Sequence, residues 1–66
     1  MTTNEIKAFF ALRGLSLLDV ARAVNEDYAA VWRVVNYERP GPRIRKKLCR
    51  KYRGLRFQPI AERKAA

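Results

Sequence analysis

Few side chains in this sequence have the types and spacing that catalysis requires. The chain has no histidine and a single cysteine, Cys49, which has no base beside it in sequence. The acidic residues are scattered, and no glycine-rich phosphate loop is present. A zinc site would need further cysteine or histidine ligands, and a disulfide within the chain is excluded. We therefore expect no enzyme, no metal and no cofactor, and we expect Cys49 to be a partly buried packing residue.

The side chains with a clear chemical signature are the basic ones, which gather in the second half of the chain. Lysine and arginine number 15 against 6 acidic residues, a net charge of +9 over 66 residues. Residues 1–38 carry four basic and five acidic side chains, whereas residues 39–66 carry eleven basic ones and a single acid, Glu62. Such a localised positive field favours a polyanion as partner, nucleic acid first and an anionic membrane surface second. A merely solubilising basic face is the alternative.

Capping signals and apolar spacing predict two helices in the first third of the chain. Thr2 and Glu5 fit a capping box that opens a helix over residues 3–13. Its inward positions are Ile6, Phe9, Phe10 and Leu12. Ser16 opens a second helix over residues 17–24, with Asp19 in the role of the acid. The amphipathic stripe of this helix consists of Leu17, Val20, Ala21 and Val24.

Two more helices are predicted before a C-terminal tail. Asn25 tolerates a left-handed conformation, and Asp27 is a good N-cap for a helix over residues 28–36. Pro42 suits the first turn of a helix over residues 42–53, whose apolar positions are Ile44, Leu48 and Tyr52. An apolar clip against the body is expected from Leu55, Phe57 and Ile60. The predicted domain thus spans residues 1–58, and residues 59–66 form a basic tail.

Residues 15–42 read LSLLDVARAVNEDYAAVWRVVNYERPGP and resemble one family pattern without a gap. That pattern, LSQxELAxxxGVSxxxISRIExGxxxP, is typical of the lambda-repressor-like (Xre/Cro-type) helix-turn-helix family. The matching residues are Leu15, Ser16, Val20, Ala21, Val31, Arg33 and Val34. The small size and the late basic helix are also similar to the Ner-like regulators of Mu-type phages.

Two positions depart from the family pattern, and both lie in the expected turn. Asn25 replaces the turn glycine but can adopt the same conformation. Glu26 replaces the apolar residue that usually follows, and a carboxylate cannot be buried unpaired at low cost. We therefore expect a turn more open than is usual in the family.

The resemblance implies an all-α, four- to five-helix lambda-repressor-like helix-turn-helix domain. It further implies a sequence-specific, double-stranded DNA-binding transcriptional regulator, a repressor of bacterial or phage origin. The second helix of the pair would read bases in the major groove through Tyr28, Ala29, Trp32 and Arg33. Phosphate contacts are expected from Ser16, Asn36, Arg39, Arg43, Arg45, Lys46 and Lys47, and Arg50, Lys51, Arg53 and Arg56 extend this basic patch.

Other interpretations stay open for the same residues. Trp32 could pack on residues 3–13 or on Tyr28, Arg33 could be a solvated charge, and Asp27 suits a cap better than a base contact. An RNA-binding or ribosome-associated helical protein is one alternative, and a protein-interaction module anchored by Trp32 is another. A homodimer, formed in solution or only on DNA, also stays open. We expect a cytoplasmic protein with no membrane span, no signal peptide and no small-molecule ligand.

Overall fold

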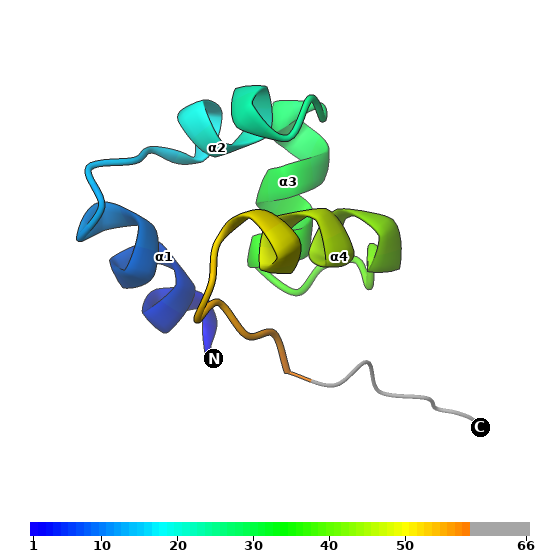
Figure 1. Cartoon of the computed structure of the whole chain (residues 1–66). Coiled ribbons are helices and arrows are strands. Elements are labelled where there is room, and N and C mark those ends of the chain that lie inside the picture. Colours follow the sequence, from blue (N-terminus) through cyan, green and yellow to red (C-terminus); the bar gives the residue numbers. More distant parts are fainter. Residues whose placement is uncertain (59–66) are drawn as a thin grey trace.

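Four α-helices make up the part of the chain that the computed structural model describes, residues 1–58 (Figure 1). They are α1 (Thr3–Ala11), α2 (Leu17–Ala23), α3 (Tyr28–Val35) and α4 (Pro42–Lys51). No strand occurs within residues 1–58, so the prediction of an all-α chain is confirmed. The predicted tail, residues 59–66, lies outside the described residues.

Reciprocal capping boxes open α1 and α2, as the sequence predicts. The backbone N–H of Glu5 donates to Thr2 Oγ1 (3.2 Å), and that of Thr2 donates to Glu5 Oε1 (2.7 Å). At α2, the N–H of Asp19 donates to Ser16 Oγ (3.1 Å), and the N–H of Ser16 donates to Asp19 Oδ2 (3.0 Å). Each box satisfies N–H groups that lack a partner within the helix, which fixes where the helix begins.

The prediction that Leu12 is an inward residue of α1 is wrong. The helix ends at Ala11, and Leu12 is 85% exposed. Successive helical residues are separated by about 100°, so Leu12 lies about 120° around the axis from Ile6. The buried stripe of α1 therefore consists of Ile6, Phe9 and Phe10 alone.

A left-handed glycine links α3 to α4. Gly41 has φ +49°, and a Cβ added there would lie 2.3 Å from Val34 Cγ2. The chain can therefore turn this close to α3 only because residue 41 has no side chain. Pro42 then takes the first helical position of α4, where its missing N–H costs no hydrogen bond.

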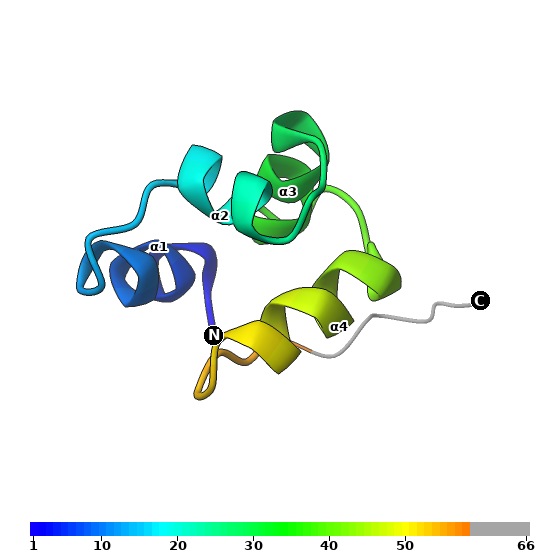
Figure 2. The same ribbon diagram turned by 45° about the horizontal axis from the view of Figure 1, so that its top comes forward.

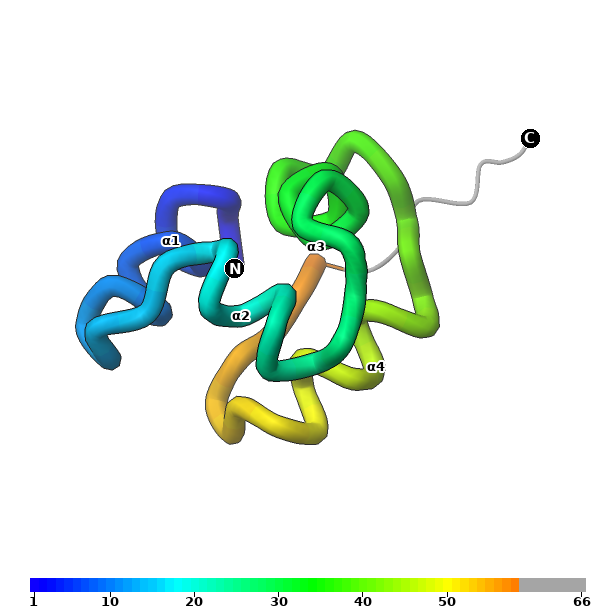
Figure 3. Tube along the Cα trace, turned by 90° about the horizontal axis from the view of Figure 1, so that it is seen from above, coloured from blue at the N-terminus to red at the C-terminus, as the bar shows by residue number. Residues whose placement is uncertain are grey.

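The buried side chains of all four helices meet in one core. Seen from above, α3 and α4 lie on opposite sides of this centre, with α1 at one end (Figure 3). Thr3 Oγ1 donates to the carbonyl of Val35 (3.0 Å) and so ties the start of α1 to the end of α3. The core consists of Ile6, Phe9, Phe10, Val20, Ala21, Val24, Val31, Val34, Val35, Ile44, Leu48 and Leu55.

Residues 55–58 return past the N-terminus, below α4 in Figure 1 and behind it in Figure 2. Leu55 is only 4% exposed, and the Phe57 ring meets the Tyr37 ring edge-on with centroids 6.2 Å apart. The Tyr37 hydroxyl accepts from the N–H of Gln58 (2.9 Å) and donates to the carbonyl of Met1. The predicted clip is therefore present at Leu55 and Phe57, whereas Ile60 lies outside the described residues.

Candidate nucleic-acid interface

A tight turn over residues 24–27 joins α2 to α3. Asn25 has φ +56°, the left-handed conformation that the sequence predicts for it. The N–H of Glu26 then donates to the carbonyl of Ala21 (2.9 Å), which closes the chain back onto α2. Asp27 occupies the N-cap position of α3, but its side chain makes no capping hydrogen bond.

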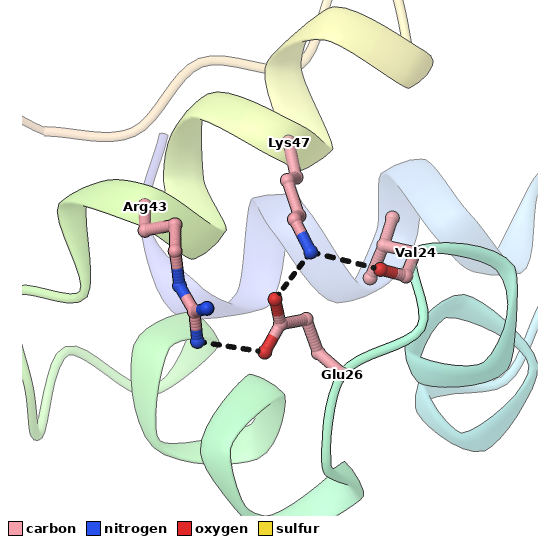
Figure 4. Close-up of polar contacts among 4 residues, drawn as sticks. All are labelled: Val24, Glu26, Arg43 and Lys47. Carbon is pink, nitrogen blue, oxygen red and sulfur yellow. Dashed lines mark hydrogen bonds and ion pairs between the residues drawn. The ribbon is translucent and has the colours of Figure 1, made fainter.

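Glu26 is held inside this turn by two cations from α4 (Figure 4). Its side chain is 8% exposed, with Lys47 Nζ at 2.5 Å and Arg43 Nη2 at 3.2 Å from its carboxylate oxygens. Lys47 also donates to the carbonyl of Val24 (3.4 Å). The hydrogen bond from Lys47, aided by the charge of Arg43, holds the pKa of Glu26 below its ordinary value of 4.5.

The expectation of a more open turn at Glu26 loses its basis in the structure. It rested on the cost of burying an unpaired carboxylate, and in the structure this carboxylate has two partners. Both partners come from α4, one helix beyond the unit that the family pattern covers. Their long side chains reach across to the turn, so the carboxylate of Glu26 can be buried without being left unpaired.

One face of α3 carries all of the predicted base-contacting residues. Val31, Val34 and Val35 face the core, and the opposite side presents Tyr28 (46% exposed), Trp32 (37% exposed), Ala29 and Arg33. These four side chains, together with Glu38, line a shallow concavity of about 330 Å³. An aromatic, largely apolar surface with one cation and one acid is thus available on the second helix of the pair.

Ser16 and Asn36, two predicted phosphate contacts, make hydrogen bonds that cap helices. The Ser16 hydroxyl donates to Asp19 Oδ2 (3.0 Å), and the hydrogen bonds from Ser16 hold the pKa of Asp19 below its ordinary value. A carboxylate therefore already lies at the start of α2, where a phosphate would otherwise bind. Asn36 Nδ2 donates to the carbonyl of Trp32 (2.8 Å) at the end of α3.

The predicted cations of α4 divide between the two flanks of that helix. Arg43 and Lys47 face the turn before α3, where they hold Glu26. Arg45 lies on the other flank, where its Nη1 donates to the carbonyl of Gln58 (2.8 Å) and its guanidinium lies 5.3 and 5.2 Å from the ring centroids of Tyr37 and Phe57. Arg39, in the loop after α3, and Lys46 are exposed. The structure therefore does not bring these cations together on one surface.

The flank of α4 that carries Arg45 borders an open groove that the sequence did not reveal. Its volume is about 740 Å³, and its lining includes the cations Arg45, Lys46, Arg53 and Arg56. Cys49 also lines it and is exposed, so the prediction of a partly buried packing residue is wrong. Part of the signal was present in the sequence, because residues 45 and 49 are four apart and so share one side of α4, whereas Arg53 follows the end of that helix.

Comparisons with protein-family models, curated proteins and solved structures find no match to this chain. Within residues 1–58, no group of histidine, cysteine, aspartate or glutamate side chains is arranged to hold a metal ion. The helices of that part of the chain are all too short or too polar to span a membrane.

Proposed function

We propose that this chain is a sequence-specific, double-stranded DNA-binding transcriptional regulator of the lambda-repressor-like helix-turn-helix class, a repressor of bacterial or phage origin. The observation that supports this proposal most directly is the exposed face of α3. Tyr28, Ala29, Trp32 and Arg33 share that face, and α3 follows α2 after a closed turn. In helix-turn-helix proteins the second helix of such a pair enters the major groove.

Each residue on this face has a chemical role in the proposed complex. Arg33 can donate two parallel hydrogen bonds to O6 and N7 of a guanine, the commonest base-specific contact in the major groove. Ala29 and the Trp32 ring offer apolar surface to a thymine methyl group. Tyr28, at the start of α3, can donate its hydroxyl to a phosphate, which fixes the orientation of the helix without reading sequence.

Cations near both ends of α3 supply the phosphate contacts in this proposal. Arg39 follows the end of α3 and is exposed. Arg43 is bound to Glu26, just before the start of α3, yet its side chain remains 76% exposed.

Two chains on half-sites about 34 Å apart would extend the sequence read beyond the few base pairs that one helix reaches.

Selection of bound duplexes from random DNA, followed by substitution of Arg33, tests this function. We expect a defined site and a loss of about 1–3 kcal/mol for Arg33→Ala on that site, with relaxed preference at one base pair. Lys7→Ala is the matched control, because Lys7 is an exposed cation on α1. Equal losses for every DNA sequence, or equal losses in the two variants, would refute base reading by Arg33.

The exposed apolar side chains support a second candidate function. Leu18, Tyr28 and Trp32 are all large and more than a third exposed, which also suits an anchor for a partner protein. RNA binding through stacking on Tyr28 and Trp32 is the remaining alternative. Competition between duplex DNA and single-stranded RNA of the same sequence separates these functions. Our proposal predicts that duplex DNA displaces the RNA, and the RNA alternative predicts that RNA displaces the DNA. A protein-interaction module should bind neither.

A further inference from the structure

We propose that the groove beside α4 is a second DNA-binding site. It holds the phosphate backbone of one DNA segment while α3 reads the bases of another. We call it the α4 groove and define it by its four cations, Arg45, Lys46, Arg53 and Arg56. This inference rests on the proposed function, because it takes duplex DNA as the partner. Its consequence is that one chain can bridge two DNA segments.

The α4 groove and the exposed face of α3 belong to different surfaces of the molecule. α3 buries Val31, Val34 and Val35, and α4 buries Ile44 and Leu48, all in the same core. The α4 groove and the concavity on the exposed face of α3 have no lining residue in common. Figure 3 shows the two helices on opposite sides of the centre. A duplex whose major groove contains α3 would therefore not run along the α4 groove.

The charge of the α4 groove suits a phosphate backbone. No acidic residue is among the side chains that line it within residues 1–58. On the other flank of α4, by contrast, Arg43 and Lys47 are already paired with Glu26. Phosphate contacts of this kind supply affinity without reading sequence, so the groove would accept DNA of any sequence.

Arg45 gives the lining of the groove a cation whose side chain is held in place. Its guanidinium is held by the Gln58 carbonyl and lies near the Tyr37 and Phe57 rings, so little side-chain freedom remains to be lost on binding. Lys46, Arg53 and Arg56 are exposed around it. Several long basic side chains beside one fixed guanidinium can contact successive phosphates of a DNA backbone.

The lack of stacking surface favours a duplex over a single strand as the occupant. Proteins that bind single strands present aromatic rings on which successive bases stack. Phe57 is the one aromatic side chain among the described residues that line the groove, and its ring is packed against Tyr37. The exposed tryptophan of the chain lies on α3, away from the groove.

Alkylation of Cys49 tests the proposal in the full-length chain. Cys49 is the only cysteine, is exposed and lines the groove, so its reaction with iodoacetamide reports whether the groove is occupied. The selected duplex is added first to occupy α3. We then expect an excess of a short duplex of unrelated sequence to slow the alkylation of Cys49 several-fold. Anisotropy of the labelled duplex, measured in parallel, establishes that DNA is bound.

Two pairs of substitutions with equal loss of charge provide the comparison. Lys46→Gln with Arg53→Gln should remove the protection of Cys49 and lower the salt dependence of binding by about 1–2 in log–log slope. Lys7→Gln with Arg22→Gln is the control, which removes two exposed cations from α1 and α2. Circular dichroism confirms that both variants fold, and Arg33→Ala should leave the protection intact.

The outcomes separate this inference from the proposed function. If anisotropy shows no DNA binding, the proposed function fails and the inference fails with it. If DNA binds but Cys49 reacts at its free rate, the groove is empty and only the inference is overturned. Equal protection in the two double variants also overturns it. So does protection by single-stranded RNA or by anionic phospholipid vesicles when duplex DNA gives none.

Discussion

Glu26 pairs with two cations beside the start of the proposed recognition helix. Lys47 and Arg43 both contact its carboxylate, and neither is fully free for a phosphate while that carboxylate is charged. The acid therefore stabilises the turn and at the same time weakens the positive field near α3. These two effects predict opposite responses of stability and DNA affinity to one substitution.

Glu26→Gln should lower stability at neutral pH and reduce the dependence of stability on pH. The pKa of Glu26 is lowered in the folded chain, so its contribution is present above its ordinary value of 4.5 and is lost as the pH falls through the lower folded value. Urea unfolding at pH 7 and pH 3 measures this change. Some acid sensitivity should remain, because the pKa values of Glu5 and Asp19 are lowered in the same direction.

The same variant should bind duplex DNA more tightly, because Arg43 is released for a phosphate contact. The salt dependence should become steeper by about 0.9 in log–log slope for one added contact. An unchanged pH dependence of stability would show that the ion pairs at Glu26 contribute nothing to the fold. Weaker DNA binding by a folded variant would contradict the competing roles of Arg43.

At the scale of elements, the segment after α4 completes the core. Leu55 packs among the buried residues of all four helices, and Tyr37 joins this segment to the N-terminus through its hydroxyl. Residues 55–58 also form one wall of the α4 groove. The short chain thus uses its C-terminal segment both for stability and for the shape of a surface.

Leu55→Ala should cost about 2–5 kcal/mol of unfolding free energy, the usual range for a leucine truncated in a core. Arg56→Ala, at the exposed neighbouring position, should change the free energy by less than about 0.5 kcal/mol. Urea denaturation of both variants measures the difference. Equal stabilities would mean that the clip does not contribute to the core.

Helix starts could be predicted from the sequence because their signals are local. Each signal acts within one turn of the helix that it opens: Thr2 with Glu5, Ser16 with Asp19, and Pro42. The helices begin where these signals place them. The helix ends lie one or two residues before the predicted ones. The partners of Glu26 could not be predicted in this way, because Arg43 and Lys47 lie 17 and 21 residues away.

The candidate site shows the same limit. Helical spacing alone places Tyr28, Ala29, Trp32 and Arg33 on one side of α3, opposite the three valines of the core. The basic residues of α4 were predicted as one clamp, because the sequence does not show which neighbouring element each flank of the helix faces. Their division into two flanks depends on the packing of Ile44 and Leu48, which sets the rotation of α4 against the core.

For the whole molecule, the uneven charge predicts how binding responds to salt. Residues 39–66 carry a net charge of +10, while residues 1–38 carry −1. Affinity for any duplex should therefore fall steeply as salt rises, with about 0.9 in log–log slope for each phosphate contact. Fluorescence anisotropy between 50 and 200 mM salt, roughly the range over which such contacts weaken, measures the slope. A flat response would exclude backbone contacts by the basic half.

The most direct test of DNA reading by α3 uses Trp32, the only tryptophan of the chain. Its side chain is 37% exposed on the face that would enter the groove, so bound DNA should shield it from acrylamide. We predict that the selected duplex lowers the acrylamide quenching of Trp32 several-fold, and that this change saturates together with the anisotropy of the labelled DNA. A scrambled duplex should give less shielding at the same occupancy. Saturated anisotropy with unchanged quenching of Trp32 would contradict the account, because the DNA would then be bound elsewhere than on α3.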